Sequence, residues 1–297
     1  MWWNSMRQEI FWHNKNVFIT GWHGFLGHAL TMRLRKLGAN VNGSSQAETF
    51  ENYQKALTNV DVVFHIGARA LVGQTKKDPL GTFQNNIQST WNILEVCRQL
   101  NVQRIIVASS DKVYGEGLNR TEESPLQGHY PYEVSKICVD HLAQCYAKMY
   151  NVPIGITRCA NLYGPGDMHI SRLIPGTILS ILKAEKPLIR SDGETLRAYL
   201  YIDDAVDAYL EFAQSNYVGA LNFSGGQAYK TIDVVKKIMN IMCKEQSPII
   251  KNEVKDEIRE QSINDTKART VLSWKSKVDL PEGLKRTAEA FKREING

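Results

Sequence analysis

Three reactive side chains follow one another directly after an apolar run in this sequence. The run "QRIIVAS" (103–109) leads into Ser110, Asp111 and Lys112, which carry a hydroxyl, an acid and a base. Groups of these types at the end of one strand can donate and accept protons in a shared pocket. The same residues also suit a capped turn whose lysine points to solvent. The triplet alone therefore leaves two interpretations, a proton-transfer site and a polar turn.

A tyrosine and a lysine follow at a spacing that also carries chemistry. In "HYPYEVSK", Tyr132 and Lys136 stand four residues apart, and Tyr130 has no lysine at that distance. Residues four apart share one face of a helix, so the ammonium can lie beside the phenol. A neighbouring cation lowers the pKa of a phenol and prepares it to take a proton from a hydroxyl. A surface tyrosine and a solvated lysine have the same spacing, so the context decides.

That context is a glycine-rich turn near the start of the chain. In "ITGWHGFLGHAL" three glycines with GxxGxxG spacing separate an apolar run at 16–20 from a helical pattern. Such a turn lets the backbone and a helix N-terminus approach a pyrophosphate, and this placement favours a dinucleotide site. The predicted cofactor contacts are Gly21, Gly24, Phe25, Leu26, Gly27, Ser44, Tyr132 and Lys136.

The end of the second strand does not distinguish the two nicotinamide cofactors clearly. An acid there would favour NAD, and an arginine nearby would favour NADP. The segment "NVNGSSQAE" offers Ser44 and Ser45, and Glu48 comes late. We expect NAD, with NADP as the alternative.

Short apolar runs alternate with helical patterns and predict how these groups are positioned. The runs lie at 16–20, 61–66, 103–109, 153–158 and 198–202. Alternation of this kind indicates a doubly wound parallel sheet of Rossmann type, an α/β fold covered on both faces. Regularity fades after about residue 164, which predicts a smaller C-terminal substrate-binding lobe. The expected boundaries are 1–165 with 196–222 for the dinucleotide-binding domain, and 166–195 with 223–297 for the lobe.

Composition narrows the class of protein. The 297 residues carry a net charge of +5 without a basic stripe, so we expect no nucleic-acid partner. The five cysteines form no CxxC pair, which indicates reduced thiols and no metal site. No stretch has the length and apolarity of a signal peptide or a bilayer span. The sequence predicts a cytoplasmic protein without a membrane partner.

Motifs spread over nearly the whole chain resemble the extended short-chain dehydrogenase/reductase family of NAD-dependent epimerases and dehydratases. They are "TGWHGFLG", "HIGA", "SSDKVYG", "YPYEVSK", "TRCANLYGPGD", "RLIPGTILSILKAEKPLI", "LRAYLYIDDAVDAYL" and "LNFSGG". Within this family, "FWHNKNVFITG" and the Ser-Asp-Lys triplet are most similar to nucleotide-sugar 4,6-dehydratases such as CDP-glucose 4,6-dehydratase. The resemblance implies a nucleotide-diphosphate sugar as substrate, a place in nucleotide-sugar metabolism and polysaccharide biosynthesis, and a homodimer.

The resemblance also implies roles for the reactive residues. Ser110 would bind the C4 oxygen of the sugar, and Tyr132, activated by Lys136, would take the C4 hydroxyl proton. Lys112 would remove the C5 proton, and Asp111, kept protonated, would give its proton to the departing C6 hydroxyl. Nucleotide-sugar contacts are implied at Asn161 and Asn222, a diphosphate contact at Arg197, and a further contact at Arg172.

The chain departs from the family pattern in one region. Only "SSQAETFENYQKALTNV" separates the second strand from "DVVFHI", so we expect one helix, one strand fewer and a looser adenine pocket. Two alternatives to the dehydratase remain. A nucleotide-sugar 4-epimerase would use the same Tyr-Lys pair, and a non-catalytic NAD(P)-binding regulator would bind the nucleotide without turnover.

Overall fold

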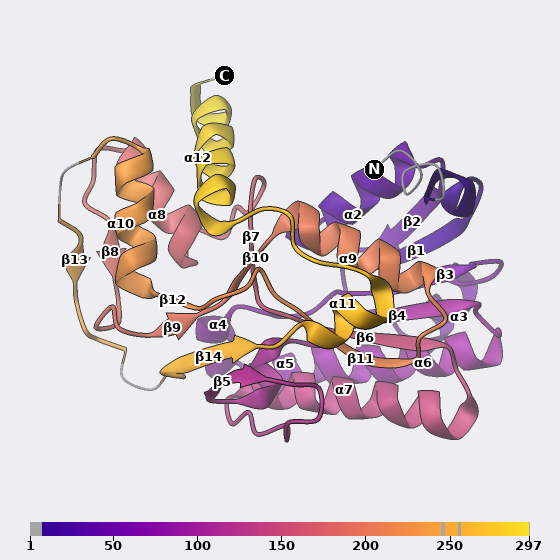
Figure 1. The fold of residues 1–297 in the computed structure, drawn as a ribbon. Coiled ribbons are helices and arrows are strands. Elements are labelled where there is room, and N and C mark those ends of the chain that lie inside the picture. Colours follow the sequence, from indigo (N-terminus) through magenta and orange to yellow (C-terminus); the bar gives the residue numbers. More distant parts are fainter. Residues whose placement is uncertain (1–7, 245–246, 255–256, 297) are drawn as a thin grey trace.

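A parallel sheet forms the centre of the protein. The computed structural model describes residues 8–244, 247–254 and 257–296. Six strands run in the order β11-β6-β4-β3-β1-β2 (Figure 1). They are β1 (Asn16–Thr20), β2 (Asn40–Ser44), β3 (Val62–His65), β4 (Arg104–Ala108), β6 (Ile154–Cys159) and β11 (Gly219–Phe223). Every residue of β3 and β4 is buried, as expected for strands that are covered on both faces.

Helices cover both faces of this sheet. Leu30 and Leu34 of α2 pack with α9 residues against one face, and Ile93 and Val139 lie in the core on the other. The first face carries α2 (Phe25–Lys36) and α9 (Ile202–Gln214), and the second carries α3 (Phe50–Ala56), α6 (Ser89–Gln99) and α7 (Pro131–Tyr150). The predicted doubly wound α/β fold is therefore confirmed.

A second group of elements gathers at one end of the sheet (Figure 1). Its helices α8 (Leu173–Leu182), α10 (Thr231–Ile241) and α12 (Leu280–Asn296) share one apolar core. Around them lie the two-stranded sheets β10-β7 and β13-β8. The strands are β7 (Asn161–Tyr163), β8 (Leu188–Ile189), β10 (Tyr199–Tyr201) and β13 (Ile249–Ile250).

A four-stranded sheet with the order β12-β9-β14-β5 joins this group to the central sheet domain. Its strands are β5 (Gly117–Arg120), β9 (Leu196–Arg197), β12 (Tyr229–Lys230) and β14 (Glu260–Ile263). The remaining elements are α4 (Val72–Lys77), α5 (Pro79–Phe83), the π-helix η1 (Gln84–Gln88), the 3-10 helix η2 (Asp111–Tyr114) and α11 (Thr266–Leu272). The predicted domain boundaries stay a prediction, because hydrogen bonds between β5 and β14 connect the two parts.

Two expectations about strands have different outcomes. The apolar run at 198–202 is β10, which pairs with β7 and does not belong to the central sheet. This correction arises because an apolar run reports burial and does not identify the neighbouring strand. The expected single helix between the second and third strands is confirmed as α3, and β2 is the edge of the sheet.

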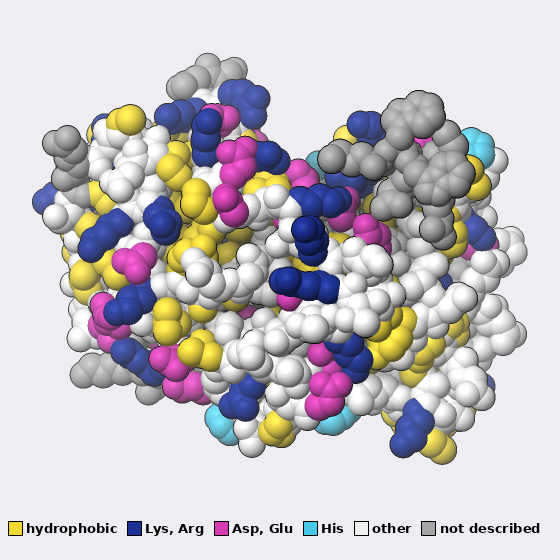
Figure 2. Space-filling model, in the orientation of Figure 1, with side chains coloured by type: hydrophobic (Ala, Val, Ile, Leu, Met, Phe, Trp, Pro, Cys, Tyr) yellow, Lys and Arg dark blue, Asp and Glu magenta, His cyan; other side chains and the backbone are white. Residues whose placement is uncertain are grey.

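The surface shows no segregation of charge on the face in Figure 2, where basic and acidic side chains are interspersed. Among the described helices, none combines the length and the apolarity that crossing a bilayer requires. The expectation that the chain has no signal peptide concerns its start, and residues 1–7 lie outside the described residues.

A buried ion pair fixes helix α7 against the sheet. Arg158 on β6 donates to both carboxylate oxygens of Asp140, at 2.9 and 2.8 Å. The Asp140 and Arg158 side chains are 0% and 3% exposed. Burial by itself raises the pKa of Asp140, but the hydrogen bonds and charge of Arg158 hold it below its usual range. Removal of either side chain would therefore leave the other charge buried without a partner, which is strongly destabilising.

We predict that Arg158→Met lowers the free energy of unfolding by about 3–5 kcal/mol, because it leaves a buried carboxylate without its cation. Urea unfolding measures the change. Arg286→Met is the matched control, since Arg286 and its partner Glu282 are each 47% exposed, and we expect a loss below about 1 kcal/mol. Equal losses in the two variants would contradict a special role for the buried pair.

Candidate active site

The glycine turn between β1 and α2 has the shape of a cradle for a pyrophosphate. Gly21 has φ +69°, and a Cβ there would lie 2.7 Å from the Gly67 Cα atom. A Cβ on Gly27 would lie 2.1 Å from the Gly21 carbonyl oxygen. Both positions therefore require glycine, as the spacing predicted.

The start of α2 offers free donors at this turn. The helix begins at Phe25, and no side chain caps it at Gly24. The first N–H groups of a helix have no partner within the helix, so those of Phe25, Leu26 and Gly27 can bind an anion. These residues fit the diphosphate of NAD.

A buried network holds the turn in place. The Thr20 hydroxyl accepts hydrogen bonds from the backbone N–H groups of Ile66 and Gly67, at 3.0 and 2.9 Å. It also bonds to His65, whose other ring nitrogen bonds to Thr90 at 2.9 Å. Burial lowers the pKa of His65 to about 3, so the ring is neutral. His65 therefore joins the ends of β1 and β3 to α6 and has no charge to offer a ligand.

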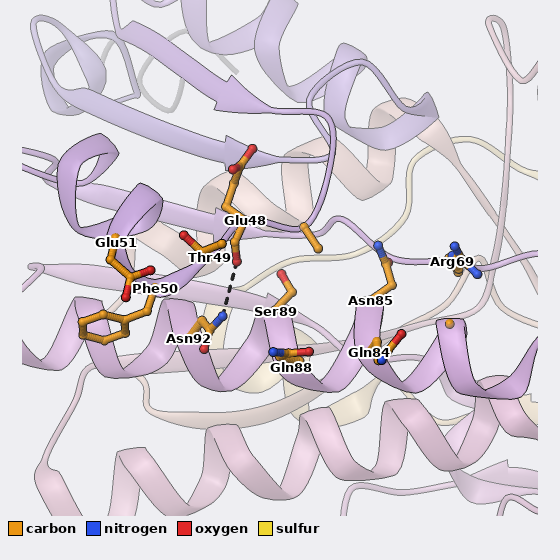
Figure 3. A pocket seen from close by; sticks show the side chains of 12 residues that line it. Glu48, Thr49, Phe50, Glu51, Arg69, Gln84, Asn85, Gln88, Ser89 and Asn92 are labelled. Carbon is orange, nitrogen blue, oxygen red and sulfur yellow. Dashed lines mark hydrogen bonds between the residues drawn. The ribbon is translucent and has the colours of Figure 1, made fainter.

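A cavity of about 660 Å³ opens beside the carboxyl ends of β2 and β3. It is lined by the loop after β2, the start of α3, Arg69 after β3, and one side of η1 and α6 (Figure 3). In the central sheet, β2 lies on one side of β1 and β3 lies on the other, so the strand order reverses at β1. Open α/β sheets bind nucleotides at such a reversal, beside the carboxyl ends of the strands. Glu48 lines this cavity. Ser44 ends β2, and its hydroxyl donates to the Gln46 carbonyl at 3.2 Å.

The Ser-Asp-Lys triplet forms both a turn and a compact polar group. Ser110 caps η2 by accepting from the Lys112 N–H at 3.2 Å, and it donates to Asp111 Oδ1 at 3.2 Å. The Asp111 and Lys112 side chains are 3% and 15% exposed and form an ion pair at 3.2 Å. Lys112 does not point to solvent, which rules out the polar-turn alternative for this residue.

Oxygen atoms from several elements surround the Lys112 ammonium. Besides Asp111, Nζ donates to Asn161 Oδ1 of β7 at 3.3 Å and to Gln261 Oε1 of β14. Burial lowers the pKa of Lys112, while the charge of Asp111 opposes this shift and that of Arg197 adds to it. A buried amine with a lowered pKa is the form that a lysine base needs.

The tyrosine and lysine of α7 are arranged differently from the expectation. The buried Lys136 ammonium donates to the carbonyl of Ala108, the last residue of β4, at 2.7 Å. Burial raises the pKa of Tyr132 to about 12, although a hydrogen bond with Ser110 opposes this. The expected lowering by Lys136 is therefore wrong for this structure, because desolvation of the phenol outweighs nearby cations. Burial lowers the pKa of Lys136 itself to about 8.

The structure brings some of the predicted substrate residues to this group. Asn161 contacts Lys112, and Arg197 and Arg172 lie close enough to influence the pKa values of Lys112 and Tyr132, respectively. Arg172 donates to the buried Asp167 at 3.1 Å, and its side chain is 34% exposed. Arg197 donates to the carbonyls of Leu196, Ile258 and Arg259.

Asn222 is placed apart from them. It is fully buried, accepts from the Tyr114 hydroxyl at 2.8 Å and donates to the Arg120 and Asn264 carbonyls. The structure thus shows where its hydrogen bonds go, and its substrate contact stays a prediction.

Sequence reasoning missed two features of the site. Gln261 contacts Lys112, but it is one glutamine in a charged stretch and belongs to no motif. Thr20 is the last residue of the first strand and directly precedes Gly21. This position next to the glycine turn is the sequence feature that could have marked Thr20 as part of the site. Its hydroxyl holds the loop after β3.

The doubly wound sheet and the glycine turn together define a Rossmann-type dinucleotide-binding protein. Residues 17–222 match the model of the NAD dependent epimerase/dehydratase family. The chain belongs to this family, and its members use NAD.

Two relatives and one solved structure illustrate the similarity. The chain is 30% identical to a dTDP-D-glucose 4,6-dehydratase of Dictyostelium discoideum over 76% of its own length, and it spans 62% of that relative. It is 25% identical to the CDP-glucose 4,6-dehydratase of Salmonella typhimurium, covering 98% of the chain and 94% of the relative. The UDP-glucose 4-epimerase of Thermotoga maritima, solved with UDP-glucose, superimposes with a TM-score of 0.90 at 26% identity, covering 94% of this chain and 99% of that one.

We predict that Gly27→Ala weakens NAD binding at least about tenfold, because the added methyl group forces the Gly21 carbonyl away and reshapes the cradle. Isothermal titration calorimetry with NAD measures the effect. Gly73→Ala is the matched control, since nothing lies within 4 Å of a Cβ there. Unchanged NAD affinity in folded Gly27→Ala protein would show that the turn is not the pyrophosphate site.

Proposed function

We propose that the protein is a nucleotide-sugar 4,6-dehydratase, which converts a nucleotide-diphosphate hexose to the 4-keto-6-deoxy sugar. The observation that carries this proposal is the Asp111–Lys112 pair, buried beside Ser110 and Tyr132. Oxidation at C4 needs only the hydroxyl and the phenol. An acid and a base in addition fit an elimination, in which a C5 proton is removed and the C6 hydroxyl leaves.

Ser110 and Tyr132 would act on the C4 hydroxyl. The Ser110 hydroxyl orients the C4 oxygen, and the Tyr132 phenolate takes its proton. Gly21, Phe25, Leu26 and Gly27 would hold the diphosphate of NAD, which would supply hydride transfer from C4 and back to C6. Tyr132 needs help to ionise, because burial raises its pKa to about 12. Lys136 is the nearest lysine on the same helix face, and a shift of its ammonium from the Ala108 carbonyl toward the phenol would supply that help.

The Asp111–Lys112 ion pair would supply both remaining groups by one proton transfer. The proton moves from Lys112 Nζ to an Asp111 oxygen 3.2 Å away. This leaves a neutral amine, which takes the C5 proton, and a neutral carboxyl group, which protonates the departing C6 hydroxyl. Water leaves, and Lys112 then holds the proton taken from C5. When the hydride is returned to C6, Lys112 gives a proton back to C5, and the proton that Tyr132 took from the C4 hydroxyl passes to Lys112 through solvent, which restores the original ion pair. Burial lowers the pKa of Lys112, and this favours release of its proton.

The substrate's diphosphate would be bound by arginines. Arg172 is the more available, because the donors of Arg197 are directed at backbone carbonyls. Asn161 would contact the sugar next to Lys112. We propose further that the enzyme acts in the cytoplasm, in nucleotide-sugar metabolism that supplies polysaccharide biosynthesis.

A 4-epimerase is the second candidate, supported by the close superposition on the Thermotoga maritima enzyme. It would need the Ser110 and Tyr132 groups but has no use for an acid and a base. The non-catalytic regulator is disfavoured, because the tyrosine and lysine of α7 are both present, the tyrosine half-buried and the lysine buried.

We predict that Asp111→Asn and Lys112→Ala spare formation of NADH from NAD but slow elimination about 10²–10⁴-fold, because each removes one proton-transfer group. The test incubates CDP-glucose, dTDP-glucose, GDP-mannose and UDP-glucose in deuterated water, and follows C5 deuterium and the 4-keto-6-deoxy product by NMR.

Lys230→Ala, at a side chain that is 48% exposed, is the control and should keep full activity. Normal product from both site variants would refute the assigned roles. Inversion at C4 without C5 exchange would identify an epimerase, and absence of turnover with every sugar would favour the regulator.

We also propose a homodimer formed through α6 and α7. Their outer surface exposes Trp91, Met149 and Tyr150 by 46%, 67% and 56%. Among the apolar residues of α7, Val139 lies in the core, and Leu142 and Tyr146 pack against it.

We predict that Trp91→Glu converts the protein to monomers in light scattering coupled to size exclusion, since a charge would be buried in the interface. Met32→Glu, at a 55% exposed position of α2 on the opposite face of the sheet, should remain dimeric. A monomeric wild-type protein would overturn the proposal.

A further inference from the structure

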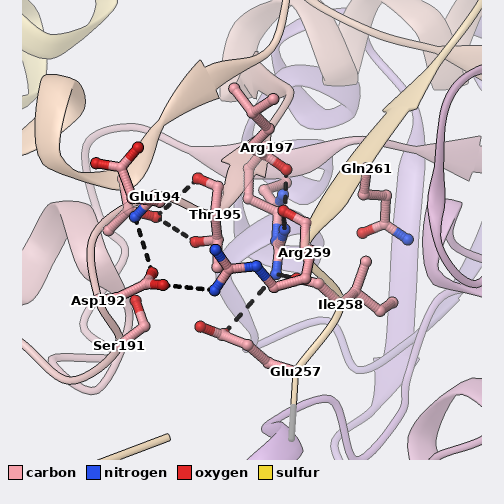
Figure 4. A network of polar contacts seen from close by, with 12 residues as sticks. Ser191, Asp192, Glu194, Thr195, Arg197, Glu257, Ile258, Arg259 and Gln261 are labelled. Carbon is pink, nitrogen blue, oxygen red and sulfur yellow. Dashed lines mark hydrogen bonds and ion pairs between the residues drawn. The ribbon is translucent and has the colours of Figure 1, made fainter. Parts of the chain in front are cut away.

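Gln261 reaches the site from the C-terminal part of the chain. It lies on β14, is 0% exposed and is 149 residues from Lys112 in sequence. Figure 4 shows it beside the polar network around Arg197 and Arg259, with its side chain directed away from that network. It therefore has a separate set of partners.

Those partners fix the orientation of the amide group. Nε2 donates to the backbone carbonyls of Asp111 and Gly115, each at 3.2 Å. Carbonyl oxygens only accept hydrogen bonds, so the nitrogen must face them. The amide oxygen is then left to face the Lys112 ammonium, which donates to it.

The strand that carries Gln261 is itself held in register. Gln261 is paired with Gly117 of β5 on one side and with Arg197 of β9 on the other. Just before it, the Ile258 and Arg259 carbonyls accept from the Arg197 guanidinium, as Figure 4 shows. Arg259 in turn donates to Asp192 at 2.6 Å. Gln261 is thus presented to Lys112 by a fixed strand.

The other groups that face Lys112 divide into charged and neutral ones. Asp111 of η2 and Glu133 of α7 favour the charged ammonium, and Arg197 of β9 opposes it. Asn161 of β7 and Gln261 of β14 offer neutral oxygens. A neutral acceptor stabilises the ammonium less than a carboxylate would. It therefore raises the pKa of Lys112 less than a carboxylate would, and the amine can still release its proton.

We propose that Gln261 is a positioning residue that holds Lys112 Nζ against Asp111 and Asn161 and sets the pH at which Lys112 can give up its proton. The inference deepens the proposed function and rests on it for the role of Lys112 as the C5 base. The geometry itself requires no substrate, so it can be tested separately.

The first measurement uses the folded protein without substrate. Competitive acetylation with acetic anhydride across a pH range, followed by mass spectrometry of the Lys112 peptide, reports the pH at which the amine becomes neutral. Gln261→Glu places a carboxylate beside the ammonium and should move this midpoint upward by about one to three pH units. Gln261→Met keeps the length but removes the acceptor, and should move the midpoint downward.

The second measurement is the pH profile of C5 exchange in deuterated water. Its acid limb should shift in the same directions as the labelling midpoint, while NADH formation keeps its profile. Glu260→Gln is the matched control, because it changes one charge at the neighbouring exposed position and should shift neither profile. Thermal unfolding of each variant identifies those that are folded at the assay temperature.

The outcomes separate the two claims. Midpoints that stay at the wild-type value in folded Gln261→Glu and Gln261→Met, or that shift equally in Glu260→Gln, overturn the role of Gln261. Opposite shifts in the two Gln261 variants support it. If they occur in a protein that converts no nucleotide sugar, the dehydratase proposal fails and the positioning role stands.

Discussion

The placement of one buried ammonium ion organises the site. A lysine charge removed from water needs acceptors around it, and a buried cation without them is strongly destabilising. For Lys112 these acceptors come from Asp111, Asn161 and Gln261, which lie on η2, β7 and β14. No single element supplies all of them, so the central sheet and the C-terminal elements must meet at this point. The requirement to solvate one charge thus fixes how two distant parts of the chain pack together.

The nucleotide side of the site depends on a different constraint, the close approach of backbone to backbone. Gly21 and Gly67 come together because neither has a Cβ, and the Thr20 hydroxyl ties the two loops. This half is built from main-chain groups, so side-chain variation around it has little influence on its shape. The half that we propose for proton transfer is built from side chains whose charges influence one another. The same scaffold can therefore keep its cofactor while its chemistry changes with a few residues such as Asp111 and Lys112.

Much of the fold follows from local patterns, because the apolar runs at 16–20 and 103–109 correspond to β1 and β4 and the glycine spacing marks the start of α2. The run at 198–202 shows the limit, since its neighbouring strand is decided by tertiary packing. In the candidate site, spacing predicted Tyr132 and Lys136, but the direction of the Tyr132 pKa shift depends on burial, which spacing does not report. Gln261 could not be found from the sequence, because its function arises from a contact between residues far apart in the chain.

The shortened segment after β2 has a consequence for the edge of the sheet. Without an outer strand, β2 presents one side of its backbone at the margin, where unpaired N–H and C=O groups can recruit strands from other molecules. This strand is short, and of its five residues only Val41 is buried, while Asn40, Asn42 and Gly43 are poor strand formers. Its composition thus makes a weak template for intermolecular pairing, so the chain dispenses with a covering strand without becoming prone to aggregate along that edge.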